Sequence, residues 1–325
     1  MTLFLETYRG YANEQEIIFF GHMYASRSRI NYELNGRRVR HAFAVLRMFT
    51  IRPIANCEVQ LEFNGKRVNT KTLADGYFRF SIPYSETLKS GWHKVVVRAE
   101  HEGQKMCSNG EFIKPFPGEY GLISDIDDTF LISHSGNFFK KLYVLLTQNI
   151  YRRNTFDKVV EHYRLLSHVG RIADSGSNAF FYVSSSEWNL YKFINRFTEI
   201  NDFPKAVIKL KKIKKGLADF LSSGRGDHNH KFQKIKDILE FYPELKFILL
   251  GDDSQKDPFI YERIVKLFPQ RVLVVYMRQI SAKPKKGVEQ VLKNISDMGT
   301  ETFYFSESAA AIEHTKSLGL VAAHQ

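Results

Sequence analysis

The chain is 325 residues long; 43% of its residues are hydrophobic and 25% are charged. This length and composition predict about two globular domains and exclude a disordered, collagen-like or coiled-coil protein. No apolar run approaches the ~20 residues of a transmembrane helix, and the first residues lack the basic and apolar pattern of a secretory leader. Two cysteines cannot form a disulfide framework, so we expect a reducing, cytoplasmic location.

The formal net charge is +12 at pH 7, which indicates an acidic partner: nucleic acid, an anionic membrane surface or a phosphorylated substrate. Solubility alone would also account for this charge. The excess is +6 in residues 1–115 (17 basic, 11 acidic) and +6 in the remainder (30 basic, 24 acidic). Because neither part forms a basic tail, nucleic acid is not the partner we expect.

The first 115 residues contain short segments that are rich in β-branched and aromatic residues and are separated by Gly-containing turns. In CEVQLEFNG (57–65), apolar and polar residues alternate with the period of a half-buried strand. The pattern predicts a small antiparallel β-sandwich over residues 1–115, with strands at 16–24, 41–49, 57–65, 77–82 and 93–100.

A Pro- and Gly-containing linker at 114–119 separates this region from a different pattern, in which apolar strands alternate with helices. Near-continuous apolar strands belong to parallel sheets that are covered on both faces. Residues 116–325 are therefore predicted to form an α/β domain with a doubly wound parallel sheet. Its strands are expected at 120–127, 179–186, 246–253 and 271–278, and its helices at 155–170, 188–197, 231–242 and 258–268.

Three of these apolar strands end in polar residues: DIDDT at 125–129, SSS at 184–186 and GDD at 251–253. Ligands of doubly wound sheets bind beyond the carboxyl ends of the strands, so these side chains are expected to converge. A set of carboxylates without His or Cys suits a hard cation held by oxygen, which favours Mg²⁺.

The DIDDT segment resembles the DxDxT motif of haloacid-dehalogenase-superfamily phosphatases. Its wider context is similar to one family within them, the phosphatidate phosphatases related to the fungal actin-patch-associated lipid phosphatase. The matching stretches are GLISDIDDT (121–129), VSSSEWNLY (183–191), HKFQKIKDIL (230–239) and FILLGDDSQKDPFIY (247–261). The resemblance implies a Rossmann-like sheet of the haloacid-dehalogenase type and hydrolysis of phosphatidate to diacylglycerol through an aspartyl-phosphate.

The same resemblance implies roles for three residues of the first motif. Asp125 matches the nucleophile, which attacks phosphorus and also ligates Mg²⁺. Asp127 matches the acid that protonates the leaving alkoxide and then activates water; its backbone carbonyl also faces the metal. Thr129 matches the position that supports this loop by hydrogen bonding.

Four residues match the later motifs. Ser184 falls at the position that binds a phosphoryl oxygen, with Ser185 and Ser186 as rivals. Lys231 falls at the position that neutralises the phosphate and the nucleophile, with Lys234 and Lys236 as rivals on the same segment. Asp252 and Asp257, the two ends of GDxxxxD, fall at the metal-binding positions. The implied Mg²⁺ ligand set is therefore Asp125, Asp127, Asp252 and Asp257.

The sequence departs from the family pattern at two positions. Glu187 stands where Pro is usual before the Trp of the second motif, and a slightly different helix entry is expected there. The fourth motif reads GDDSQ where GDSGQ is more usual, so Asp253 adds a carboxylate and competes with Asp257 for the metal site. His228 and His230 would be a zinc alternative, but their i, i+2 spacing suits a strand better than a helix, and no Cys follows them.

Two further segments bear on the substrate. Residues 130–178 occupy the place of a substrate-covering cap, and their aromatic, aliphatic and Arg content suits a lipid phosphate or an ordinary packed helix. The run at 205–215 has six lysines and no acid, which fits peripheral docking on anionic lipid or a solvated strand face. The same chemistry on a polynucleotide end, a phosphoprotein or a metabolite is an alternative, as is a catalytically silent binding module.

Overall fold

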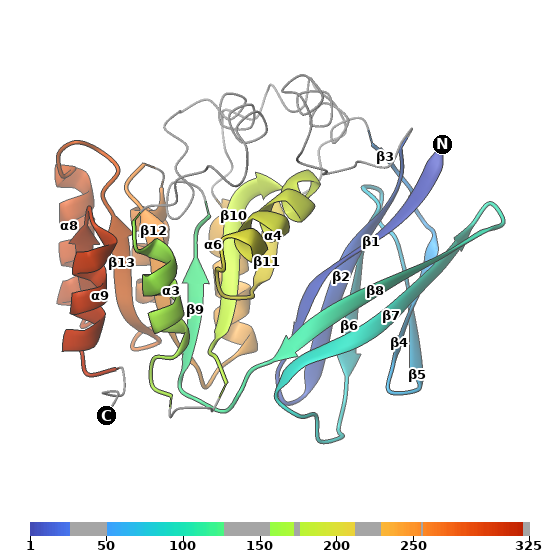
Figure 1. Ribbon diagram of the computed structural model, residues 1–325, viewed down its shortest axis with the longest axis horizontal. Coiled ribbons are helices and arrows are strands. Elements are labelled where there is room, and N and C mark those ends of the chain that lie inside the picture. The colour runs from blue at the N-terminus through green and yellow to red at the C-terminus, as the bar shows by residue number, and fades with distance from the viewer. Residues whose placement is uncertain (27–50, 127–156, 172–175, 212–228, 255, 321–325) are drawn as a thin grey trace.

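The computed structural model describes residues 1–26, 51–126, 157–171, 176–211, 229–254 and 256–320. These residues form two β-sheets, of which the second carries helices on both faces (Figure 1). The predicted α/β class is confirmed. The strand expected at 41–49 lies outside the described residues.

The first sheet is built from residues 2–114 and has the strand order β3-β2-β1-β8-β7-β4-β5, with β6 paired to β2. Its pairs are antiparallel except β1–β8, which run parallel where Gly10 lies opposite Phe112 and Tyr11 opposite Ile113. Its strands are β1 (Thr2–Ala12), β2 (Glu16–Ser26), β3 (Arg52–Pro53), β4 (Glu58–Phe63), β5 (Lys66–Lys71), β6 (Tyr77–Pro83), β7 (Gly91–His101) and β8 (Gln104–Lys114).

A hydrophobic cluster lies inside this sheet and draws on both of its halves. Phe19 of β2 and Phe78 of β6 meet Val59 of β4, Val97 of β7 and Phe112 of β8, and all five side chains are buried. In β4 the buried Val59 and Leu61 alternate with more exposed polar residues, as the sequence predicted. Burial of these side chains holds β2 and β6 against β4, β7 and β8.

The second sheet has the strand order β11-β10-β9-β12-β13-β14, and all of its pairs are parallel. The strand of this sheet that comes first in sequence, β9, lies in the middle, so the strand order reverses there. Ligands of doubly wound sheets bind at the carboxyl ends of the strands beside such a reversal. The strands are β9 (Tyr120–Ser124), β10 (Ala179–Glu187), β11 (Val207–Lys211), β12 (Lys246–Asp252), β13 (Val272–Arg278) and β14 (Glu301–Phe305).

The helices of this part cover both faces of the parallel sheet. In Figure 1, α3 and α9 lie in front of the sheet and α6 lies behind it. Helix α3 contacts α9, while α7 contacts both α6 and α8. The helices are α3 (Val159–Ser167), α4 (Tyr191–Ile200), α6 (Asn229–Phe241), α7 (Asp257–Leu267), α8 (Lys286–Asp297) and α9 (Ser308–Ser317), and a 3₁₀ turn, η2 (Trp188–Leu190), precedes α4.

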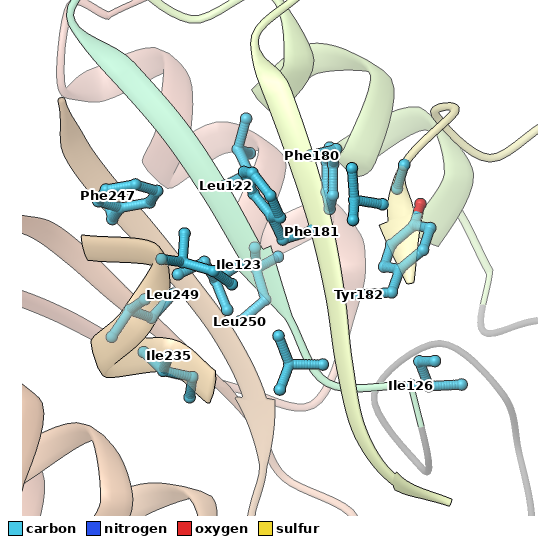
Figure 2. Packing of buried hydrophobic residues seen from close by; sticks show 14 of the residues in the cluster. Leu122, Ile123, Ile126, Phe180, Phe181, Tyr182, Ile235, Phe247, Leu249 and Leu250 are labelled. Atoms are coloured by element: carbon cyan, nitrogen blue, oxygen red, sulfur yellow. The ribbon is translucent and has the colours of Figure 1, made fainter. Parts of the chain in front are cut away.

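The core of the parallel sheet explains why its strands are apolar at nearly every position. Leu122 and Ile123 of β9 lie between Phe181 of β10 and Leu249 and Leu250 of β12 (Figure 2). Each of these side chains is buried, since helices shield both faces from water. This packed sheet determines the positions of the carboxyl ends of its strands and of the polar residues there.

A second hydrophobic cluster includes residues of both sheets. Tyr8, Tyr11 and Phe20 of the first sheet belong to the same buried cluster as the strands of the second. Tyr242 donates a hydrogen bond to the carbonyl of Ala12 at 3.1 Å, so β1 is tied to the end of α6 by a polar contact as well. No helix among the described residues is long and apolar enough to cross a membrane.

Candidate functional site

The register of the parallel sheet brings three motifs to one edge. Ser124, the last residue of β9, lies opposite Tyr182 of β10 and Leu250 of β12. Asp125, Ser184 and Asp252 therefore lie one or two residues beyond this level, Ser184 within β10 and Asp252 as the last residue of β12. All three of these side chains are buried. This convergence is the one expected from the sequence.

Three carboxylates form a buried acidic cluster at this edge. Asp125, Asp252 and Asp257 each offer an oxygen, and these oxygens lie within 4.8 Å of one another. Asp257 reaches the cluster because it starts α7 directly beside the end of β12. Gly251 makes room for it: a Cβ at this position would lie 2.8 Å from Asp257 Oδ2.

Lys231 lies inside the acidic cluster. Its Nζ is 2.8 Å from Asp125 Oδ1, and it also forms an ion pair with Asp257. Burial alone would lower the pKa of Lys231, but the charges of Asp125 and Asp257 outweigh it and raise the pKa above its ordinary value. Lys231 is therefore a fixed positive charge that contacts the predicted nucleophile.

The cluster carries more negative charge than one lysine neutralises. Burial, and then the charge of Asp257, raise the pKa of Asp252 to about 7. Oδ2 of Asp257 is buried and has no hydrogen-bond partner among the described residues. Carboxylate oxygens that converge in this way are the ligands that Mg²⁺ takes, so Asp125, Asp252 and Asp257 fit a small hard cation.

Asp253, the additional acid of the fourth motif, is turned away from this cluster. Its carboxylate accepts hydrogen bonds from Ser281 Oγ at 2.6 Å, Tyr304 OH at 2.7 Å and the Ile280 N–H at 2.9 Å. Burial would raise the pKa of Asp253, but the hydrogen bonds, with Lys285 nearby, lower it. Between the two rivals, Asp257 joins Asp125 and Asp252, and Asp253 anchors the loop after β13.

The rivals of Lys231 are also separated by their contacts. Lys236 pairs with Glu240 one turn along α6, and Lys234 donates to the carbonyl oxygen of Ser184 at 3.4 Å. Of the three lysines, Lys231 alone forms ion pairs with the cluster among the described residues. Ser184 Oγ accepts a hydrogen bond from the Ser186 N–H at 2.9 Å, which orients the hydroxyl at the strand end.

Several predicted residues lie outside the described residues. These are Asp127 and Thr129 of the first motif, most of the cap-like segment, Lys212, Lys214 and Lys215 of the basic run, and His228. The described end of the cap-like segment forms α3, whose Tyr163 shares a 2.6 Å hydrogen bond with Ser124. This part of the segment therefore supports β9 from the helix layer.

Arg278 is a residue of this edge that the sequence reasoning missed. It ends β13 directly opposite Asp252 and is buried. Its Nη2 donates to Ser308 Oγ at 2.9 Å and its guanidinium lies 4.8 Å from the Phe305 ring centroid. Burial lowers the pKa of Arg278 to about 10, so the group stays charged at pH 7 beside the acidic cluster. A charged residue that ends an otherwise apolar strand was the available signal.

The entry into α4 differs from a helix that begins at Pro. Glu187 is buried and extended, with φ −81° and ψ 154°, and the 3₁₀ turn η2 follows it before α4 starts at Tyr191. The helix entry expected to change because of Glu187 stays a prediction.

Comparisons with known proteins cover the part of the chain that contains this sheet edge. Residues 120–279 match the family model of the phosphatidate phosphatase APP1 catalytic domain. Phosphatidate phosphatase APP1 of Saccharomyces cerevisiae is 31% identical over 175 residues, which are 50% of this chain and 27% of that protein. An uncharacterized protein of Schizosaccharomyces pombe is 20% identical over 255 residues, covering 75% of this chain and 39% of its own length.

This chain thus spans well under half the length of these two relatives. Among solved structures, a carbohydrate acetylesterase from Xanthomonas citri aligns with 94% of this chain and 68% of its own, at 10% identity and a TM-score of 0.32. A superposition that loose carries no argument about fold or function. The match over residues 120–279, with the 31% identity, shows that this chain is related to the APP1 phosphatidate phosphatase family.

Proposed function

We propose that this chain is a Mg²⁺-dependent phosphatidate phosphatase, a phosphoric monoester hydrolase that converts phosphatidate to diacylglycerol. Its relation to the APP1 family supports the substrate. The observation that carries the chemistry is the buried ion pair of Lys231 with Asp125, inside a cluster that includes Asp252 and Asp257. A nucleophilic carboxylate, a fixed cation and two further acids are what phosphoryl transfer to Asp requires.

In the first step of the proposed reaction, a carboxylate oxygen of Asp125 attacks phosphorus and the bond from phosphorus to the glycerol oxygen breaks. Asp127 gives its proton to that oxygen, so diacylglycerol leaves as the alcohol. In the second step Asp127 takes a proton from water, which attacks the phosphorus of the aspartyl-phosphate. Inorganic phosphate leaves, and Asp125 is restored as a carboxylate.

The remaining residues bind and orient the phosphoryl group. Lys231 holds Asp125 in place and neutralises the charge gathered there, and Ser184 would donate its hydroxyl to a phosphoryl oxygen. Asp125, Asp252 and Asp257, with the carbonyl of Asp127, would hold Mg²⁺. The bound ion supplies further positive charge to the phosphoryl oxygens.

The finer architecture belongs to the same proposal. Residues 116–325 would form a catalytic domain of the haloacid-dehalogenase type with a Rossmann-like sheet, capped by residues 130–178. Residues 1–115 would form an all-β sandwich beside it. The enzyme would act in the cytoplasm and reach its substrate peripherally, through its net positive charge.

The test is phosphate release by the purified chain from phosphatidate in detergent micelles, glycerol 3-phosphate, a 5′-phosphorylated oligonucleotide and a phosphopeptide. We expect hydrolysis of phosphatidate to exceed that of the soluble substrates by roughly 100-fold in kcat/KM. EDTA should stop release, and Mg²⁺ should restore it better than Ca²⁺, because Ca²⁺ prefers more ligands and longer bonds. Faster hydrolysis of a soluble phosphoester would contradict the lipid substrate; release in EDTA would contradict the metal.

A further inference from the structure

A cavity of about 630 Å³ lies between the two sheets, apart from the acidic cluster. Its walls come from β1, β2 and β6 of the first sheet and from β11, η2 and α6 of the second. The proposed reaction uses none of its lining residues. The cavity is therefore a feature of how the two sheets meet.

One side of the cavity is basic. Lys209 and Lys211 of β11 and Lys234 of α6 line it, and no described carboxylate forms an ion pair with any of the three. Lys234 is half-buried, and within the described ranges its ammonium donates one long hydrogen bond, of 3.4 Å, to the carbonyl of Ser184. Burial first, then the charges of Lys209, Lys231 and Lys211, lower the pKa of Lys234 to about 7. Crowded cations of this kind are stabilised by a bound anion.

The acids that line the same cavity make contacts of their own. Asp75 accepts a hydrogen bond from the Tyr77 N–H, Asp237 accepts one from Gln233, and Glu240 pairs with Lys236. Asp237 and Glu240 are exposed, whereas the three lysines and Asp75 are half-buried. The half-buried charges that line the cavity are therefore mostly positive.

Aromatic side chains also line the cavity. Tyr11, Phe20 and Trp188 line the cavity, and the ammonium of Lys209 is held 4.7 Å from the Tyr11 ring centroid and 3.0 Å from its hydroxyl. His22 also lines it, and its buried Nε2 has no hydrogen-bond partner within the described part of the chain. Aromatic walls that flank a few polar groups are typical of sites for ligands with an apolar body.

We propose that this cavity is a second ligand site, which binds a phosphate group carried on a partly apolar molecule. Lys209, Lys211 and Lys234 bind the phosphate, and the aromatic wall contacts the apolar part. The carbonyl of Ser184 connects the site to the strand end beside the acidic cluster. The chemistry fits the headgroup of an anionic lipid or a free phosphate, and binding requires no turnover.

The test uses Trp188 as a reporter. The chain has two Trp residues, so Trp92→Phe leaves Trp188 in the cavity wall as the single Trp. Asp125→Asn in the same protein prevents hydrolysis. The probes are dioctanoyl phosphatidylglycerol, dioctanoyl phosphatidylcholine and inorganic phosphate. Both lipids are used below their critical micelle concentrations. Phosphatidylglycerol is a diester and is no substrate for a monoester hydrolase, so failure of binding and failure of the proposed function are separate results.

We expect saturable fluorescence change with phosphatidylglycerol and none with the zwitterionic phosphatidylcholine. Lys234→Met should weaken binding about tenfold or more, and Lys211→Gln by several-fold, as for a lost charge-assisted contact. The matched control is Lys236→Met on the same helix, outside the cavity, which should leave affinity within about twofold. A thermal melt of each variant checks folding, and Lys211→Gln serves if Lys234→Met is unfolded.

Inorganic phosphate identifies the source of the ligand. If phosphatidylglycerol binds tightly and inorganic phosphate binds weakly or not at all, the natural ligand is a lipid headgroup. Equal affinities for the two probes indicate that the site takes free phosphate. No saturable change with either phosphate probe would overturn the proposal. Equal affinity in the Lys234→Met and Lys236→Met proteins would overturn it as well.

Discussion

The Nζ atom of Lys231 lies 2.8 Å from Oδ1 of Asp125, and both side chains are almost completely buried. The contact joins the first turn of α6 to the end of the central strand β9. A buried charge that loses its partner costs far more than an exposed one. The pair therefore links the stability of the sheet edge to its proposed chemistry.

Replacement of Lys231 by Met should destabilise the chain by roughly 3–5 kcal/mol in EDTA, because Asp125 and Asp257 would then be buried without a cation. Urea unfolding measures the change. Adding Asp257→Asn to Lys231→Met should recover part of the loss. The surface control Lys236→Met breaks only its pair with Glu240 and should cost less than about 1 kcal/mol. Equal losses in the free energy of unfolding for Lys231→Met and Lys236→Met would show that the buried ion pair contributes no more to stability than the exposed one.

Mg²⁺ should raise the melting temperature of the wild-type chain, because a ligand that binds only the folded state stabilises it. Asp252→Asn should abolish the shift, whereas Asp253→Asn should keep it, since Asp253 is turned towards Ser281 and Tyr304. Because the pKa of Asp252 is raised to about 7, Mg²⁺ must displace a proton at pH 6, and the shift should grow from pH 6 to pH 8. A shift that survives in Asp252→Asn would remove this residue from the metal site.

Replacement of Gly251 by Ala should disturb the acidic cluster, since the new Cβ would lie 2.8 Å from Asp257 Oδ2 and 2.9 Å from the Tyr261 ring. We expect a loss of about 1–3 kcal/mol in stability, as for overpacking, and a weaker thermal response to Mg²⁺. Gly287→Ala in α8 is the control, because no atom lies within 4 Å of its Cβ position. If Gly251→Ala had the melting temperature and the Mg²⁺-induced shift of the control, the close contact between Gly251 and Asp257 would be contradicted.

Lys234→Met should raise the melting temperature, and more at pH 6 than at pH 9. The pKa of Lys234 falls from 10.5 to about 7 on folding, so the unfolded chain binds more protons between these values and stability rises with pH there. The penalty is complete below pH 7, where folded Lys234 is charged beside Lys209, Lys211 and Lys231, with His230 and Asp237 also lining the cavity. Thermal melts at the two pH values, with Lys236→Met as the reference variant, measure this gain. A larger gain in melting temperature at pH 9 would contradict the lowered pKa of Lys234.

The sequence predicted the four inner strands of the parallel sheet because they are apolar on both faces, but it did not predict the two edge strands, β11 and β14. Strand β10 was expected at 179–186 and spans Ala179–Glu187, and α7 was expected at 258–268 and spans Asp257–Leu267. The strand β5 was missed, because KRVNTK is mostly polar and exposed at the sheet edge. The parallel β1–β8 contact also went unpredicted, since it depends on packing between distant segments.

The acidic cluster was predictable from the motifs, because strand ends of a parallel sheet meet at one edge. The orientation of Asp253 was not, since it depends on Ser281 and Tyr304, which lie far away in sequence. The role of the lysines in 205–215 was equally hidden. Lys205 pairs with Glu111 of β8, and Lys209 packs on Tyr11, so these two are bound to the first sheet.

The most direct test of the proposed function is phosphate release from phosphatidate by the wild-type chain and by Asp125→Asn, both in Mg²⁺. The amide has nearly the size of the carboxylate but cannot attack phosphorus, so we expect the variant to lose at least about 10³-fold in kcat while remaining folded. Circular dichroism and a thermal melt establish that fold. An Asp125→Asn protein that keeps more than about a tenth of wild-type kcat would contradict Asp125 as the nucleophile.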